Sequence, residues 1–177
     1  TIEYVTAMDP DKAETTNTVK MQRPDTSDPW SDITSSETVY NKYQISKNGW
    51  MGNNTLGIIK WEVTVKCNDK NSTLKGKTIT DNMLKAGQKV SIKVGNDTID
   101  ATVASDGELV LPDSIGDNNE VVISYETKVA DYDLGDPNSS GYYSVKNTAG
   151  IDGFHSDKTV YYKPVNEKSK TVLDISQ

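Results

Sequence analysis

Hydrophobic and polar residues alternate strictly along two segments of the chain. In the first segment the apolar positions are Ile59, Trp61, Val63, Val65 and Cys67, with polar residues between most of them. The second repeats the pattern at Val121, Ile123, Tyr125, Thr127 and Val129. Because successive side chains of a strand point to opposite faces, this alternation is typical of half-buried antiparallel strands. No segment sustains a helical stripe, so the sequence predicts an all-β fold.

Strand-like runs follow one another at the spacing of a β-sandwich. Turn residues such as Gly95-Asn96-Asp97 and Asp106-Gly107 separate them. Residues 81–87 predict one short helical turn, which Gly87 closes. The predicted strands cover residues 37–47, 57–67, 76–80, 88–94, 97–104, 107–111, 119–129, 142–151 and 158–163, with a further strand at 170–175.

The chain divides into three predicted parts. Residues 1–35 lack periodicity and are broken by prolines, so we interpret them as an extended N-terminal arm or as added strands at the end of the domain. Residues 36–156 form the predicted sandwich, and residues 157–177 form a C-terminal strand, latch or linker. The chain starts abruptly and without a signal peptide, so we interpret it as a fragment of a longer protein.

Composition and charge narrow the classes of partner. The chain has 177 residues and a formal net charge of −7. This acidity disfavours nucleic acid and anionic membrane surfaces, because both attract basic faces. Cys67 is the single cysteine, which excludes an internal disulfide. The sequence contains no transmembrane run, phosphate loop or metal-spaced Cys/His set, so we expect neither a cofactor nor a metal.

Three predicted strands each place one polar residue on their apolar side. An asparagine stands in the middle of the inward series Tyr143, Val145, Asn147, Ala149 and Ile151. A lysine ends the series Val39, Asn41, Tyr43, Ile45 and Lys47. Asp81 shares the parity of Ile79 at the end of a third strand. The pattern therefore predicts that an amine, a carboxyl group and a carboxamide point into the same interior.

These three groups together favour a specific reaction. Burial of a charged group is costly, and a desolvated lysine loses its proton and becomes a nucleophile. A protonated Asp81 would donate a hydrogen bond to the amide oxygen of Asn147 and polarise its carbon. Attack by Lys47 would then release ammonia and leave a covalent Lys–Asn amide. The parity alone also allows Lys47 to reach solvent, Asp81 to cap the following turn and Asn147 to bond the backbone.

Three motifs follow one another over roughly residues 37–152. They are the turn Ser46-Lys47-Asn48-Gly49 with the strand Ile59-Lys60-Trp61-Glu62-Val63-Thr64-Val65, the segment Lys77-Thr78-Ile79-Thr80-Asp81-Asn82-Met83-Leu84, and the strand Tyr143-Ser144-Val145-Lys146-Asn147-Thr148-Ala149. In this order they resemble the motifs of domains in Gram-positive collagen-binding adhesins and fimbrial subunits. The apolar segment after Gly49 departs from the family's pattern, and Lys42 is a rival nucleophile.

The resemblance implies an immunoglobulin-like, Greek-key β-sandwich that crosslinks itself. The matching residues imply an isopeptide bond between Lys47 and Asn147, with Asp81 as its catalyst. They imply a structural, force-resisting domain of an adhesin or pilus on the cell wall of a Gram-positive bacterium. Its chemistry would be a single autocatalytic turnover and not enzymatic. The expected partners are host extracellular-matrix proteins or neighbouring pilin and adhesin domains.

Two ligand-binding functions are alternatives to a purely structural role. A module that grips collagen or fibrinogen would add a strand of its ligand to an exposed sheet edge. A carbohydrate-binding module would present exposed aromatic side chains, for which Trp30, Trp50 and Tyr132 are candidates.

Other chemically active residues carry weaker patterns. Asp131, Asp133 and Asp136 are candidate calcium ligands, although the same loop also reads as a solvated turn. His155 lies in a polar turn without an accompanying nucleophile motif, which argues against a catalytic triad. The inward strand position of Cys67 predicts a small core residue and argues against a thioester.

Overall fold

The computed structural model describes Asp9, residues 14–21 and residues 33–165 of the chain. Within these ranges the fold is built from antiparallel strands, which confirms the all-β prediction. The strands are β1 (Glu14–Met21), β2 (Ile33–Tyr40), β3 (Tyr43–Asn53), β4 (Ile58–Cys67), β5 (Thr78–Asp81), β6 (Lys89–Val94), β7 (Asp97–Thr102), β8 (Glu108–Val110), β9 (Glu120–Lys128), β10 (Tyr143–Ile151) and β11 (Phe154–Tyr162).

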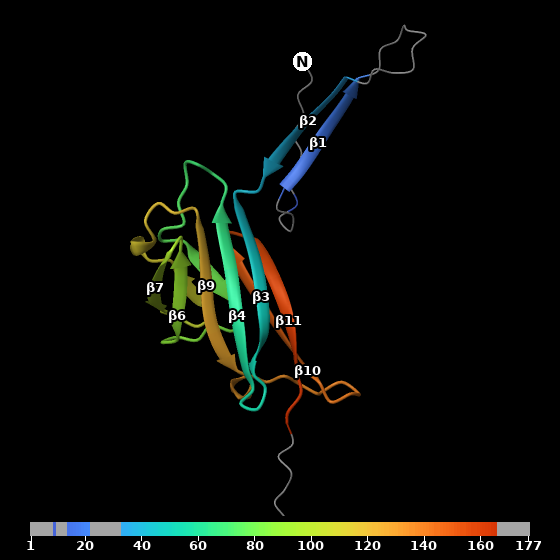
Figure 1. The fold of residues 1–177 in the computed structure, drawn as a ribbon, viewed down its shortest axis with the longest axis vertical. Coiled ribbons are helices and arrows are strands. Elements are labelled where there is room, and N and C mark those ends of the chain that lie inside the picture. The colour runs from blue at the N-terminus through green and yellow to red at the C-terminus, as the bar shows by residue number, and fades with distance from the viewer. Residues whose placement is uncertain (1–8, 10–13, 22–32, 166–177) are drawn as a thin grey trace, which may run out of the picture.

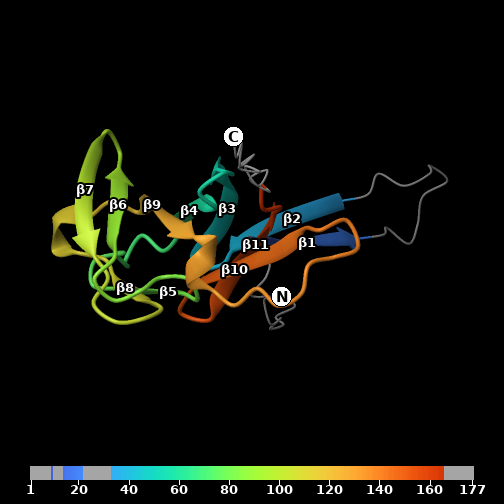
Figure 2. The same ribbon diagram turned by 90° about the horizontal axis from the view of Figure 1, so that it is seen from below.

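Two larger sheets form the body of the molecule and lie face to face (Figures 1 and 2). One has the strand order β3-β4-β9-β6-β7 and the other the order β11-β10-β5-β8. The chain changes sheet after β4, β5, β7, β8 and β9, so both sheets mix early and late strands. The edge strands β3 and β11 approach each other, and the backbone N–H of Lys47 donates to the Ser156 hydroxyl at 3.1 Å.

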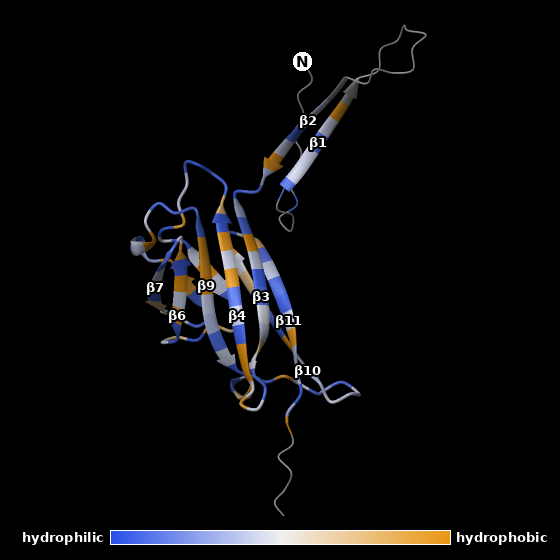
Figure 3. Cartoon of the chain, viewed as in Figure 1, coloured by the Kyte–Doolittle hydropathy of each residue, from blue (hydrophilic) through white to orange (hydrophobic). Residues whose placement is uncertain are grey.

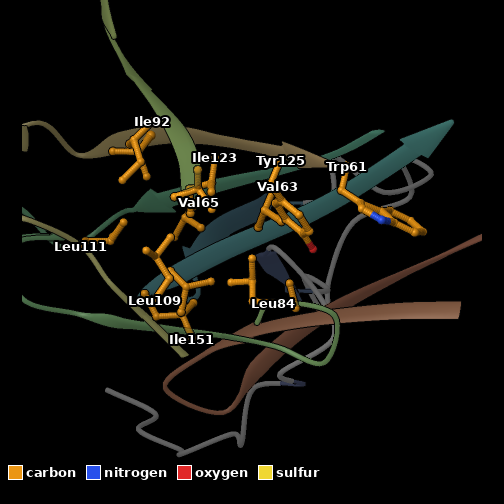
Figure 4. Packing of buried hydrophobic residues seen from close by; sticks show 14 of the residues in the cluster. Trp61, Val63, Val65, Leu84, Ile92, Leu109, Leu111, Ile123, Tyr125 and Ile151 are labelled. Carbon is orange, nitrogen blue, oxygen red and sulfur yellow. The ribbon is translucent and has the colours of Figure 1, made fainter. Parts of the chain in front are cut away.

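The alternation seen in the sequence produces the core between these sheets. Along β4 and β9 every second residue is buried, and the hydropathy of β4 alternates visibly in Figure 3. One continuous cluster of buried side chains draws on both sheets. Figure 4 shows part of it, with Val63 and Tyr125 from the larger sheet near Leu84. The polar residues that stand among these alternating buried positions therefore lie in the same interior.

Strands β1 and β2 form a separate two-stranded sheet that projects from the body (Figure 1). The predicted strand 37–47 is therefore broken, and residues 37–40 pair with β1 instead of continuing into β3. The break occurs where Asn41 is buried: its side-chain N–H donates to the Asp9 carbonyl at 3.0 Å, and its own carbonyl accepts from Asn68 at 2.8 Å. The alternation of residues 37–47 predicts one continuous strand, but the hydrogen bonds of Asn41 accompany a break in it.

The C-terminal boundary also differs from the predicted division at residue 156. Strand β11 begins at Phe154 and pairs with β10 along its whole length, so residues 157–162 belong to the four-stranded sheet. The two strands are joined by a tight turn in which Asp152 and Gly153 both have positive φ, at 46° and 87°. The predicted strand at 170–175 lies outside the described residues.

The predicted helical turn at residues 81–87 is wrong. The segment forms non-helical turns, because the Asp81 carboxylate accepts the Met83 N–H at 3.0 Å and the Gly87 N–H is drawn to the Val103 carbonyl at 2.8 Å. Gly87 does have the left-handed backbone expected of it, with φ of 80°. In the described residues the helical segments are two three-residue 3-10 turns, Asp113–Ile115 and Val129–Asp131, and no helix is long and apolar enough to cross a bilayer.

Candidate functional site

Lys47 enters the interior from the edge strand β3. Its side chain is 0% exposed, although the residue lies near the end of an inward series where a lysine is usually expected to reach solvent. The rival Lys42 is exposed, and its amine lies over the Tyr43 ring at 5.5 Å. The structure therefore places Lys47, and not Lys42, among the buried residues.

Asp81 and Asn147 come from the opposite sheet. Strand β5 pairs with β10 so that Asp81 stands opposite Ala149, and Asn147 lies two residues from Ala149 on the same face. Asn147 is 0% exposed and Asp81 2% exposed. The prediction that Lys47, Asp81 and Asn147 point inward is confirmed, and the three residues bridge the two layers.

The hydroxyl of Tyr125 on β9 connects these three side chains. The Lys47 amine donates to Asp81 Oδ2 at 2.5 Å and to the Tyr125 oxygen at 2.9 Å. The Tyr125 hydroxyl donates to the same Asp81 oxygen, and it accepts a hydrogen bond from Asn147 Nδ2 at 2.8 Å. Lys47, Asp81, Tyr125 and Asn147 are hereafter called the buried cluster.

Two aromatic rings enclose the Lys47 amine. Its nitrogen lies 5.2 Å from the centre of the Trp61 ring and 5.2 Å from that of Tyr125, within the range of cation–π attraction. The Trp61 indole is held in place by a 2.8 Å hydrogen bond to the Thr127 hydroxyl. A Cβ atom at Gly49 would lie 2.3 Å from the Trp61 ring, so the glycine makes room for this wall of the site.

Burial and charge act in opposite directions on Lys47. Desolvation lowers the pKa of its amine, whereas the attraction and hydrogen bond of Asp81 raise it; the first effect is larger. Burial, followed by the charge of Asp81, raises the pKa of Tyr125 well above its ordinary value. Burial therefore weakens the hold of the Lys47 amine on its proton and keeps the Tyr125 phenol neutral.

The carboxamide of Asn147 is only partly satisfied. Its Oδ1 atom is buried and has no hydrogen-bond partner among the described residues. The expected direct hydrogen bond from Asp81 to this oxygen is absent among the described residues. Asp81 is linked instead to the amide nitrogen, through the Tyr125 hydroxyl. A buried carbonyl without a donor is costly in a purely structural asparagine, typically by 1–3 kcal/mol. A donor that arrives during a reaction would remove this cost.

Tyr125 is the member of the cluster that the sequence patterns do not single out. Its inward position was predicted, but as an ordinary core aromatic. The sequence did contain a signal: Tyr125 and Thr127 both place a hydroxyl on the inward face of one strand, and a buried hydroxyl needs a polar partner. The Thr127 hydroxyl accepts a hydrogen bond from the Trp61 indole, and the Tyr125 hydroxyl accepts one from the amide of Asn147.

The other chemically active residues lie elsewhere. Cys67 is buried at the end of β4, as predicted for a core residue, and His155 is exposed on β11. No group of three or more His, Cys, Asp or Glu side chains in the described part of the chain is placed to hold a metal. In the loop proposed for calcium, Asp133 accepts the Gly135 N–H at 3.1 Å, which is the bond of a local turn.

Two of the three aromatic candidates for carbohydrate binding lie in the described residues. Trp50 is 44% exposed on β3. Tyr132 is partly buried and its hydroxyl donates to the Met83 carbonyl at 2.7 Å, so it has a structural role in the loop after Asp81. Trp30 lies outside the described residues.

Comparison with protein-family models, curated proteins and solved structures finds no match for this chain. The geometry and chemistry of the buried cluster are therefore the guide to the function of the protein.

Proposed function

We propose that the protein crosslinks itself by an isopeptide bond between Lys47 and Asn147, with Asp81 as catalyst. The observation that carries this proposal is the arrangement of the buried cluster: a desolvated amine, a carboxyl group and an incompletely bonded carboxamide share one buried site. Folding holds the two reacting groups of one chain together in this site, which raises the effective concentration of the amine by many orders of magnitude.

The reaction needs no external reagent. The Lys47 ammonium gives one proton to the Asp81 carboxylate, and the neutral Nζ attacks Cγ of Asn147. The Cγ–Nδ2 bond then breaks, Nζ loses a second proton, and Nδ2 gains one and leaves as ammonia. An amine and a primary amide become a secondary amide and ammonia, in a single turnover that consumes the site.

The strand order supports an immunoglobulin-like sandwich for the body. In that fold one sheet has the order A-B-E-D and the other contains C, F and G. The order β3-β4-β9-β6 corresponds to A-B-E-D and the order β11-β10-β5 to G-F-C, with β7 and β8 as additional strands between D and E. Under this assignment Lys47 lies on the first strand and Asn147 on the next to last.

A bond between these strands fits a protein that resists force. It would join the two sheets covalently, so that a pull on the chain ends cannot separate β3 from β10 by breaking hydrogen bonds worth about 1 kcal/mol each. We therefore propose a structural domain of a cell-surface adhesin or pilus of a Gram-positive bacterium, located outside the cell. Its partners would be adjacent pilin or adhesin domains or a host matrix protein.

Intact-mass measurement tests the bond directly. The wild-type chain is expected to weigh less than its sequence by one ammonia molecule, and Lys47→Ala, Asp81→Ala and Asn147→Ala are expected to keep the full sequence mass. Lys42→Ala is the matched control, because it removes a nearby exposed lysine and should leave the ammonia loss unchanged. A wild-type chain at full sequence mass would refute the proposal.

The same variants should lose stability. The bond would close a loop of about 100 residues, which is worth on the order of 5 kcal/mol by analogy with a disulfide. We expect the variants without the bond to melt about 10–20 °C below the wild type in calorimetry. Lys42→Ala should melt within a few degrees of the wild type.

A further inference from the structure

We propose that Tyr125 is a catalytic proton relay in this reaction: its hydroxyl delivers to Asn147 Nδ2 the proton that this nitrogen needs to leave as ammonia. The inference rests on the proposed isopeptide bond and deepens it. It assigns a catalytic role to a residue that the three-residue scheme of Lys47, Asp81 and Asn147 does not use.

The hydrogen bonds place Tyr125 between the proton source and the leaving group. Among the described residues, Nδ2 of Asn147 makes its side-chain hydrogen bond to the Tyr125 hydroxyl, at 2.8 Å. That hydroxyl in turn donates to Asp81 Oδ2, the oxygen that accepts from the Lys47 amine. No hydrogen bond within the described part of the chain joins Asp81 to Asn147 directly, so the phenol is the path between them.

The direction of the Asn147–Tyr125 hydrogen bond reverses as the reaction proceeds. In the starting amide the nitrogen lone pair is conjugated with the carbonyl, and Nδ2 acts as a donor. After Nζ has added to Cγ, the nitrogen is an amine with a free lone pair. It can then accept the hydroxyl hydrogen of Tyr125, which rotates away from Asp81 Oδ2 to reach it.

The proton count closes without an external acid or base. Asp81 takes the first proton from the Lys47 ammonium and passes a proton to the Tyr125 oxygen as the hydroxyl hydrogen moves to Nδ2. The Cγ–Nδ2 bonding electrons leave with the nitrogen as ammonia. Asp81, again a carboxylate, accepts the second proton from Nζ. Tyr125 begins and ends as a neutral phenol, and the cluster has no net charge before or after.

The environment of Tyr125 suits a relay that stays neutral. Burial raises the pKa of the phenol, which argues against a phenolate acting as a base and favours concerted transfer through the hydroxyl. A purely structural tyrosine at this position would need only one acceptor for its hydroxyl, yet this hydroxyl contacts all three reacting side chains.

The test is the rate of ammonia loss in the full chain after Tyr125→Phe. The chain would be made in a cell-free translation pulse, quenched in denaturant at timed intervals and weighed intact. Because general acid–base catalysis contributes about 100-fold or more, we expect the Tyr125→Phe chain to lose ammonia at least about 100-fold more slowly than the wild type. Completion at the wild-type rate would overturn the relay.

Tyr132→Phe is the matched control. It removes a hydroxyl that donates to the Met83 carbonyl, next to the Asp81 loop, and that makes no hydrogen bond to Lys47, Asp81, Tyr125 or Asn147 among the described residues. We expect it to react at close to the wild-type rate. Equal slowing in Tyr132→Phe and Tyr125→Phe would show that the loss comes from displacement of the Asp81 loop, and the relay would be rejected.

A second measurement on the wild-type chain separates proton transfer from packing. The rate of ammonia loss should fall in heavy water, and this isotope effect should shrink in Tyr125→Phe, because the relayed proton is then missing. An isotope effect unchanged by the substitution would contradict the relay. If the variant folds poorly, the absence of an isotope effect in the wild type would also contradict it. If the wild type shows no ammonia loss at all, the proposed function fails; if only the Tyr125 results fail, the bond stands without the relay.

Discussion

Before the bond forms, the stability of the folded chain depends on whether the buried Lys47 amine is protonated. In that state a charged amine lies between two aromatic rings and beside a carboxyl group, and its burial makes the charged form costly. A variant that cannot form the bond, such as Asn147→Ala, preserves this state and makes it measurable.

For Asn147→Ala we expect stability to depend on the titration of Lys47. Burial lowers the pKa of Lys47 in the folded chain, whereas in the unfolded chain it returns to about 10.4. Between the two pKa values the unfolded chain binds more protons than the folded chain, so the free energy of unfolding rises with pH across this window. The stability gained in this way is lost again as the pH falls through the pKa of Lys47 in the folded chain. Urea midpoints measured from pH 6 to about pH 10 test this.

The control for this pH dependence is Lys47→Met in the same Asn147→Ala background. Methionine keeps most of the side-chain volume but has no proton to lose, so the difference between the two pH profiles isolates Lys47. If the two profiles run parallel, the amine is not desolvated in the way that we infer.

Glycine at position 49 sets the position of Trp61. We expect Gly49→Ala to destabilise the fold by about 1–3 kcal/mol or more, because its Cβ would overlap the Trp61 ring at 2.3 Å. It should also slow ammonia loss by moving the ring away from the Lys47 amine. Chemical denaturation and timed intact mass measure the two effects.

Gly52→Ala is the matched substitution on the same strand. Its Cβ would come within 2.8 Å of Lys60, but Lys60 has a flexible and half-exposed side chain that can move aside. We therefore expect a change within about 0.5 kcal/mol and a normal rate of ammonia loss. Equal effects at the two glycines would mean that crowding of Trp61 is not the cause.

Sequence parity could locate Lys47, Asp81 and Asn147 because each is a polar exception in an apolar row. It could not distinguish Tyr125 from a core tyrosine, since tyrosine is amphipathic and fits an apolar row without appearing exceptional. The distances within the cluster depend on the register of β5 against β10 and on the packing of two sheets, and neither is encoded within a single strand.

At the scale of the elements, the alternating strands were predictable and the breaks between them were not. Strands β4 and β9 follow their patterns almost residue for residue. The break between β2 and β3 depends on long-range contacts of Asn41 with Asp9 and Asn68. The segment that starts at Asp81 resembles a helical turn in sequence, but the Asp81 carboxylate accepts hydrogen bonds from the Met83 N–H and the Lys47 amine instead of capping a helix.

The sheet of β1 and β2 should be dispensable for the body. Its described side chains are exposed or half-buried, and an isolated two-stranded sheet is marginally stable. We expect a chain that starts at Asn41 to lose ammonia normally and to lose about 1 kcal/mol of stability, the value of the hydrogen bond between Asn41 and Asp9. Intact mass and calorimetry check both, and failure of the shortened chain to lose ammonia would show that the body needs this sheet.

At the scale of the whole molecule, the proposed bond determines how much of the chain can extend under force. A pull on the two ends would enter the body at β3 and leave it at β11, whereas Lys47 and Asn147 lie on β3 and β10. The segment between them would be closed into a loop by the bond. Strand β11 and the ends of the chain lie outside that loop and remain free to unravel.

We therefore expect the wild-type chain, stretched by its ends in a single-molecule force experiment, to release only the residues outside this loop. Lys47→Ala should extend further by roughly 350 Å, since about 100 more residues unravel at about 3.5 Å each. Lys42→Ala should behave as the wild type, because its exposed amine takes no part in the cluster. The difference in extension shows which residues are joined as well as whether a bond exists, because a bond from Lys42 would close a longer segment. Equal extension of the wild type and Lys47→Ala would mean that no covalent bond carries the force.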